Sequence, residues 1–416
     1  MQNSNKQQLY KIFKNKEFLY FIITRFALVF SLFLINTVVS YKLYTITKDP
    51  LSLGLIGLFE VIPAFICAFF AGYFVDKNEK RWIYFLCIIG YVLNGLLFLY
   101  ATSNYFTGQH SVRTVEVAIY SGMFISGILR AFISPASFSL MPLLVKTNEI
   151  SVAVTWTSTS WLLGSVMGPL VGGLLLAWIG ITYSIQIAIL TLLICGVLIL
   201  QIKRKPITFT KDVGIVKGLA EGFRFVFGNQ IILAVISLDL FAVLFGGAEA
   251  LLPVVAKDIL DVGEIGYGWL RSAHGIGSIF LLLVLAYIPL KSNVGKKLFV
   301  SVGLYGLCIL LFGISSSFVI SFGLLFMAGL FDGVSVVIRQ SILQIKTPSE
   351  IKGRVSSINM MFISSSNELG AFESGFAARL MGTIPAIIFG GIMTIIVVLS
   401  TFLFAPKVRK LNSLDE

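Results

Sequence analysis

Charged residues are scarce in this sequence of 416 residues. Asp, Glu, Lys and Arg together make up 12% of it, whereas 57% of the residues are hydrophobic. Soluble domains contain about a quarter charged residues. With a mean hydropathy of +0.92, a soluble fold of this length would have to bury more apolar surface than its interior can hold. The composition therefore excludes an ordinary soluble protein and indicates a chain that uses the lipid bilayer as its solvent.

Cysteine and histidine are also rare. There are two histidines, and none of the four cysteines forms a CxxC pair, so the sequence indicates neither a disulfide framework nor a metal centre. Motifs of metalloproteases, nucleotide-binding loops, serine hydrolases and dinucleotide-binding folds are absent. We expect no enzyme activity, no metal and no cofactor. The residues concerned are Cys67, Cys87, Cys195, Cys308, His110 and His274.

The net charge of +12 raises the possibility of nucleic-acid binding. The basic residues, however, flank apolar segments instead of forming one patch. We interpret them as a signal of membrane topology and expect no nucleic-acid partner.

Twelve apolar segments are long enough to cross a bilayer, which takes about 20 residues. The sequence therefore predicts an all-α membrane protein with twelve transmembrane helices in two six-helix bundles. The segments are about 18–40, 51–74, 82–101, 117–145, 150–178, 181–202, 230–256, 266–290, 298–316, 319–345, 354–378 and 383–405.

The loops alternate in charge. Most of the 32 Lys and Arg residues lie in the two tails and in the loops after even-numbered spans, and very few follow odd-numbered spans. By the positive-inside rule, both termini face the cytoplasm. The first apolar segment is too long for a signal-peptide core, so we expect it to be retained. The predicted location is the inner (plasma) membrane, with the lipid bilayer as a partner.

The longest internal polar stretch divides the chain. We expect one bundle over 1–202, a cytoplasmic linker over 203–229 and a second bundle over 230–416. Within the linker, residues 214–227 carry apolar side chains at helical spacing, which predicts a short amphipathic helix at the cytoplasmic interface.

The loop between spans two and three contains Gly72, Asp76, Lys77 and Arg81. A tight turn must join two helices here, Asp76 can cap a neighbouring helix, and the basic residues anchor the turn in the cytoplasm. This pattern resembles the signature loop of the major facilitator superfamily. It differs at Glu79, where a glycine is usual.

Span five carries small residues at close spacing around a proline, which lets two helix backbones approach closely. The pattern is similar to the motif of the antiporter branch of the superfamily, and the alternative is ordinary helix packing. Its residues are Gly164, Gly168, Pro169, Gly172 and Gly173.

Two further stretches, 218–225 and 347–375, resemble the subfamily of enterobactin exporters and macrolide efflux proteins. The resemblance extends over essentially the whole chain. It implies export of a siderophore or an amphiphilic small molecule, with a macrolide, another drug or a lysophospholipid as alternative cargo.

Charges inside predicted spans are functional candidates, because a charge at mid-bilayer is costly. Glu60 and Arg130 are the first candidates for proton coupling, since opposite charges on neighbouring helices can pair, with a static ion pair as the alternative. Asp239 and Asp332 are further candidates. Asp239 and Glu249 are ten residues apart, which places them about 15 Å apart along one helix.

Other polar or aromatic residues in the spans are candidates for lining a substrate cavity, with helix packing as the alternative. Glu249 lies beside Gly246 and Gly247, which suits a hinge or an outer gate. For His274 the sequence favours a structural role, because a lone histidine is not a specific signal. The cavity candidates are Arg25, Glu249, Arg339, Asn367, Glu368, Glu373 and Trp161.

These observations together predict a secondary active transporter that exports a small molecule at the expense of the proton gradient. A membrane sensor or scaffold is disfavoured, because the longest cytoplasmic segment is too short for an independent output domain. We expect a monomer.

Overall fold

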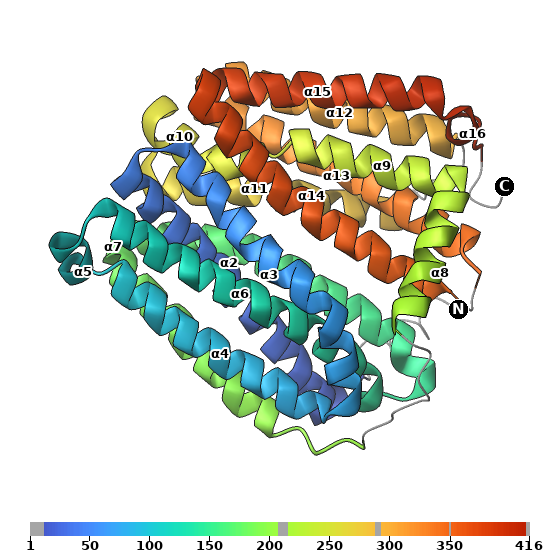
Figure 1. Ribbon diagram of the computed structural model, residues 1–416, viewed down its shortest axis with the longest axis horizontal. Helices are drawn as coiled ribbons and strands as arrows, with labels where there is room; N and C mark the ends of the chain where they lie inside the picture. The colour runs from blue at the N-terminus through green and yellow to red at the C-terminus, as the bar shows by residue number, and fades with distance from the viewer. Residues whose placement is uncertain (1–11, 207–214, 288–292, 349–350, 413–416) are drawn as a thin grey trace. The chain divides into compact units, whose positions relative to one another are not determined.

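A computed structural model describes residues 12–206, 215–287, 293–348 and 351–412 of the chain. Its described part is built from helices and contains no strand (Figure 1). The long helices are α2 (Lys16–Thr47), α3 (Pro50–Lys77), α4 (Lys80–Ala101), α6 (Val112–Leu140), α7 (Ile150–Leu200), α9 (Gln230–Phe245), α11 (Gly263–Tyr287), α12 (Val294–Ile314), α13 (Phe318–Lys346), α14 (Lys352–Met381) and α15 (Thr383–Phe404).

Ten helical segments of the described chain are long and apolar enough to cross a membrane. One of them contains α7, a run of 51 residues in which Gly180 leaves the helical conformation with φ 76° and ψ 176°. Glycine alone adopts such an angle without strain, so α7 comprises the predicted spans five and six. Helix α14 has 30 residues, but its serines and carboxylates lower its hydropathy. Counting both halves of α7 and adding α14 confirms the predicted twelve-helix fold class.

Span seven is not the continuous helix that we expected. Helix α9 ends at Phe245, and after Gly246 and Gly247 the chain continues in short turns: η4 (Ala248–Leu251), α10 (Leu252–Val254) and η5 (Val255–Ile259). Two consecutive glycines weaken a helix. Packing also requires glycine at position 247, because a Cβ there would lie 2.7 Å from the backbone of Gly370 in α14.

The predicted amphipathic helix is confirmed as α8 (Ile215–Gly228). Its residues Phe223 and Val226 pack on a cluster that includes Ile232 of α9 and Ile358 of α14. The preceding linker residues 207–214, like parts of both tails, lie outside the described residues. A short helix that we did not predict, α5 (Asn104–Gln109), follows α4.

The helices gather into two compact units. The first comprises Met1–Ile46 and Ile62–Lys211, and the second comprises Thr47–Val61 and Asp212–Glu416. The beginning of α3 therefore groups with the second unit, where Gly54 packs against the backbone of Ala371 in α14. Within the second unit, α12 lies beside α13 and α15 (Figure 1).

Candidate functional site

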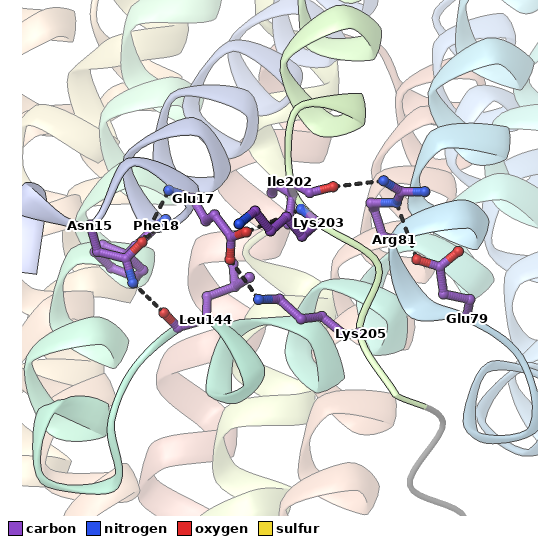
Figure 2. Close-up of polar contacts among 9 residues, drawn as sticks. All are labelled: Asn15, Glu17, Phe18, Glu79, Arg81, Leu144, Ile202, Lys203 and Lys205. Atoms are coloured by element: carbon purple, nitrogen blue, oxygen red, sulfur yellow. Dashed lines mark hydrogen bonds and ion pairs between the residues drawn. The ribbon is translucent and has the colours of Figure 1, made fainter.

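The loop between α3 and α4 lies in the first unit and is as tight as predicted, since α3 ends at Lys77 and α4 begins at Lys80. The guanidinium of Arg81 donates a hydrogen bond of 2.6 Å to the carbonyl oxygen of Ile202, just after α7 (Figure 2). Its Nε lies 3.1 Å from a carboxylate oxygen of Glu79. Glu79, the departure from the usual glycine, thus becomes the ion-pair partner of the loop arginine.

The other residues of the signature loop have fewer contacts. The side chain of Asp76 is exposed and forms no hydrogen bond to another described residue, so its predicted capping role stays a prediction. The ammonium of Lys77 lies 4.1 Å from the centroid of the Tyr73 ring. Among the described residues beyond its own turn of helix, nothing lies within 4 Å of the position that a Cβ would take at Gly72.

Polar bonds also secure the beginning of α2 at this end of the unit (Figure 2). The side-chain amide of Asn15 donates to the carbonyl oxygen of Leu144 at 2.6 Å, at the end of the short helix η2 (Met141–Leu144). The carboxylate of Glu17 accepts from the backbone N–H of Lys203 at 3.1 Å and from Nζ of Lys205 at 2.5 Å. Side-chain bonds therefore connect the ends of α2, η2 and α7.

The glycine-proline motif of α7 lies against α2, as its spacing predicted. A Cβ on Gly164 would lie 3.0 Å from the carbonyl oxygen of Phe26, and one on Gly168 would lie 2.7 Å from that of Phe30. A Cβ on Gly172 would lie 3.5 Å from Leu34, which is an ordinary van der Waals distance. Pro169 and Gly173 are buried. Small residues are required here because the two backbones pass so close to each other.

Arg25 connects three helices of the first unit. Its guanidinium donates to the hydroxyl of Ser137 in α6 at 2.6 Å and to the carbonyl oxygen of Thr157 in α7 at 3.2 Å. The ring of Trp161 is 47% exposed and lies edge-on to Phe33. A cavity role for these residues stays a prediction.

Glu60 and Arg130, the first candidates for proton coupling, are both half-buried. Glu60 lies in the part of α3 that groups with the second unit, whereas Arg130 lies on α6 of the first unit. Their pairing stays a prediction.

The second unit contains a buried ion pair between Asp239 of α9 and Arg339 of α13. Both side chains are almost completely enclosed. Arg339 was a sequence candidate for lining the cavity, and its guanidinium is directed at Asp239 of span seven.

A second charged cluster brings together three elements of the second unit. Nδ1 of His274 in α11 lies 3.2 Å from Oε1 of Glu249 in η4. Nε2 of the same ring lies 3.6 Å from Oδ2 of Asp332 in α13. The imidazole thus stands between two carboxylates, and we call these three residues the carboxylate–histidine cluster. Sequence reasoning missed the role of His274 in it.

The members of the cluster differ in exposure. The side chain of Glu249 is 49% exposed, whereas those of His274 and Asp332 are each 27% exposed. Nε2 of His274 is covered and has no hydrogen-bond partner among the described residues.

Neighbouring residues hold the segment that carries Glu249. The hydroxyl of Tyr305 in α12 donates to the carbonyl oxygen of Gly246 at 3.0 Å, and the Tyr305 ring centroid lies 6.3 Å from that of His274. Arg271, one turn before His274, approaches the carbonyl oxygen of Glu249 at 3.5 Å. The cluster is thus built at the break after α9. A gate role for Glu249 stays a prediction.

The chemistry of the cluster follows from the imidazole. A neutral ring has one N–H donor, and a protonated ring has two. Only the protonated ring can donate toward both carboxylates. The described residues include no group of three or more His, Cys, Asp and Glu side chains placed to hold a metal ion.

The α14 candidates differ in their surroundings. Asn367 is exposed, whereas Glu368 and Glu373 are half-buried. A Cβ on Gly57 of α3 would lie 2.8 Å from the carbonyl oxygen of Glu368, so α3 and α14 pass very close to each other there. Contact of these residues with substrate stays a prediction.

Comparison with known proteins agrees with this architecture. The family model of the Major Facilitator Superfamily matches residues 21–371. The enterobactin exporter EntS of Shigella boydii is 22% identical over 93% of this chain and 91% of its own length. The uncharacterized MFS-type transporter YvqJ of Bacillus subtilis is 25% identical over 91% of this chain and 89% of its own length.

Solved transporter structures share the fold at low sequence identity. A POT family transporter in complex with 5-aminolevulinic acid superposes with a TM-score of 0.74 at 12% identity, over 94% of this chain and 96% of that one. A D-xylose–proton symporter superposes with a TM-score of 0.73 at 13% identity, over 94% of this chain and 98% of that one. With the family match extending over most of its length, the chain belongs to the Major Facilitator Superfamily and is a multi-pass membrane transporter, not an enzyme.

Proposed function

We propose that this transporter exports a siderophore-like or other amphiphilic small molecule in exchange for protons, with both termini in the cytoplasm. The observation that carries the proton part of the proposal is the carboxylate–histidine cluster of Glu249, His274 and Asp332. The arrangement places one titratable ring between two carboxylates at a break in a membrane helix.

Protonation of His274 changes the forces on the broken span. Two unit charges about 4 Å apart attract by about 4 kcal/mol at the effective dielectric constant of a protein surface. Inverting a two-state equilibrium from 1:99 to 99:1 takes about 5.5 kcal/mol. The two carboxylate contacts of a protonated ring are therefore of the magnitude needed to move the segment after Gly246 between two positions.

The proposed cargo rests on the relatives. Enterobactin exporters match over most of both chains, although at 22% identity. The stretches 218–225 and 347–375 carry the same resemblance. Exporters of macrolides, other drugs or lysophospholipids are the alternative within the family.

Proteoliposomes that contain the purified chain test the proposal. Enterobactin, a macrolide or a lysophospholipid is supplied on one side, and a pH gradient is imposed across the membrane. We expect enterobactin to move faster with the gradient and to lose this acceleration when a protonophore is added. Movement at one rate with and without the gradient contradicts proton coupling. Movement of another cargo alone contradicts the siderophore assignment.

The variant His274→Gln tests whether His274 couples proton movement to transport. We expect this variant to lose gradient-driven transport about tenfold or more, the effect of about 1.4 kcal/mol or more of coupling energy, while exchange of labelled for unlabelled cargo without a gradient continues. His110→Gln is the matched control, because His110 is exposed and remote in sequence. Equal behaviour of the two variants contradicts the role of His274.

A further inference from the structure

The surface of the second unit contains a hollow that the transport cycle above does not use. It has a volume of about 610 Å³. Its walls come from α8, from the beginning of α9 and from the short helix α16 (Pro406–Arg409), which Figure 1 places at one end of the unit. The lining residues are Arg224, Phe225, Gly228, Asn229, Gln230, Ile231 and Lys407.

Two cationic side chains line this hollow, Arg224 from α8 and Lys407 from α16. Both are exposed, and within the described parts of the chain neither forms an ion pair. Glu221 is the acidic residue nearest to Arg224 along α8, but its carboxylate is bound to Arg354. The positive charge of the hollow is therefore not balanced by the described residues around it.

The beginning of α9 adds the polar residues Asn229 and Gln230 to the lining, together with the positive end of a helix dipole. The side-chain oxygen of Asn229 accepts hydrogen bonds from the backbone N–H groups of Ile231 at 3.1 Å and Ile232 at 3.2 Å. This cap begins the 16-residue helix α9, whose first residues line the hollow. A helix N-terminus favours an anion, which adds to the attraction of Arg224 and Lys407.

Large apolar side chains that lie close in sequence to the same cations are exposed. Phe227, three residues after Arg224, is 59% exposed, and Phe404, three residues before Lys407, is 88% exposed. Leu403 beside it is 68% exposed. A small soluble anion would contact only the cationic hollow. A molecule with an anionic headgroup and hydrocarbon chains can contact both the cationic hollow and the exposed apolar side chains.

We propose that the hollow binds the headgroup of an anionic phospholipid, with Arg224 and Lys407 contacting the phosphate and with Phe227 and Phe404 against the acyl chains. Basic pockets at the ends of transmembrane helices attract such headgroups. The lipid holds α8, α9 and α16 together. This assignment does not depend on the cargo or on the coupling ion.

Native mass spectrometry of the full chain in detergent tests the assignment. Phosphatidylglycerol and phosphatidylcholine with the same acyl chains are titrated in parallel. We expect phosphatidylglycerol to bind about thirty-fold more tightly, as two basic contacts predict. The double variant Arg224→Gln/Lys407→Gln is expected to lose this preference. Its thermal unfolding in detergent verifies that it is folded.

The matched control is Lys146→Gln/Lys296→Gln, which removes the same charge from two exposed residues that do not line the hollow. We expect it to keep the lipid preference. An equal loss in both double variants indicates general surface charge and overturns the site. Equal binding of the two lipids by the wild type also overturns it. Displacement of the lipid by millimolar glycerol phosphate assigns the site to a soluble phosphate compound instead.

Discussion

Asp239 of α9 and Arg339 of α13 form an ion pair in the interior of the second unit. Arg339 is 3% exposed and Asp239 is 7% exposed. Ile338 and Ile342, on either side of Arg339 along α13, belong to the apolar core of the same unit. Because neither charge reaches water, each needs the other, and the pair holds α9 to α13.

Removing one partner of this pair is therefore expected to destabilise the protein strongly. Asp239→Asn leaves the Arg339 charge buried without its counter-charge, which costs about 3–5 kcal/mol. We expect a clear drop in the thermal unfolding temperature in detergent. A matched control is Arg379→Gln, which breaks the exposed pair with Asp49 and is expected to cost less than about 1 kcal/mol. Equal drops in the two variants contradict a structural role for the buried pair.

The glycine motif of α7 predicts a graded effect of added methyl groups. Gly168→Ala places a Cβ 2.7 Å from the carbonyl oxygen of Phe30 and forces α7 away from α2, at a cost of about 1–3 kcal/mol. Gly172→Ala meets Leu34 at 3.5 Å, an ordinary contact, and is expected to be neutral or slightly stabilising because alanine favours helix. The thermal unfolding temperatures of the two variants in detergent test this difference in stability. A Gly172→Ala variant that is less stable than Gly168→Ala contradicts the packing described here.

Patterns that depend on local physics could be predicted from the sequence. Apolar segments of sufficient length gave the helices, because a bilayer demands about 20 apolar residues per crossing. The spacing of Gly164 and Gly168 predicted a close helix contact, which the structure shows with α2. The apolar periodicity of 214–227 predicted α8.

Contacts between helices could not be predicted in the same way, because partner choice depends on how each helix is rotated. The sequence placed Asp239 and Glu249 on one helix, but the break at Gly246 separates them, and each joins a different cluster. His274 carried no specific signal on its own. Its role emerges only when Glu249 and Asp332 come to opposite sides of one ring.

The orientation of the chain predicts which loops are accessible from outside the cell. Asn148, between α6 and α7, follows an even-numbered span and should face the cytoplasm, whereas Tyr105 in α5 should face outward. In a background with Cys67→Ser, we expect a membrane-impermeant maleimide to label Tyr105→Cys in intact cells. Asn148→Cys should be labelled only after permeabilisation. The reverse pattern contradicts the proposed topology.

Tyr305 is expected to position the carboxylate–histidine cluster without binding the proton. Its hydroxyl satisfies the carbonyl oxygen of Gly246, the residue at which α9 breaks. Tyr305→Phe removes one of the two hydrogen bonds to this carbonyl oxygen, since the backbone N–H of Ala248 also donates to it at 2.8 Å. The loss costs about 0.5–1.5 kcal/mol and loosens the segment that carries Glu249. We expect gradient-driven transport to slow and its pH profile to shift, while cargo exchange without a gradient continues.

Tyr91→Phe is the control for Tyr305→Phe, since Tyr91 donates to the carbonyl oxygen of Ser126 at 3.4 Å in the first unit. Loss of the Tyr91 hydroxyl should reduce the stability of the protein without moving the pH profile of transport, because no member of the carboxylate–histidine cluster lies in the first unit. A shift of the pH profile in both variants, or in neither, contradicts a positioning role. A shift of the pH profile in Tyr305→Phe alone supports the positioning role. The Tyr305 hydroxyl donates to the carbonyl oxygen of Gly246 and not to the imidazole nitrogens. Such a shift would therefore mean that the conformation of the break after α9 is coupled to the protonation of His274.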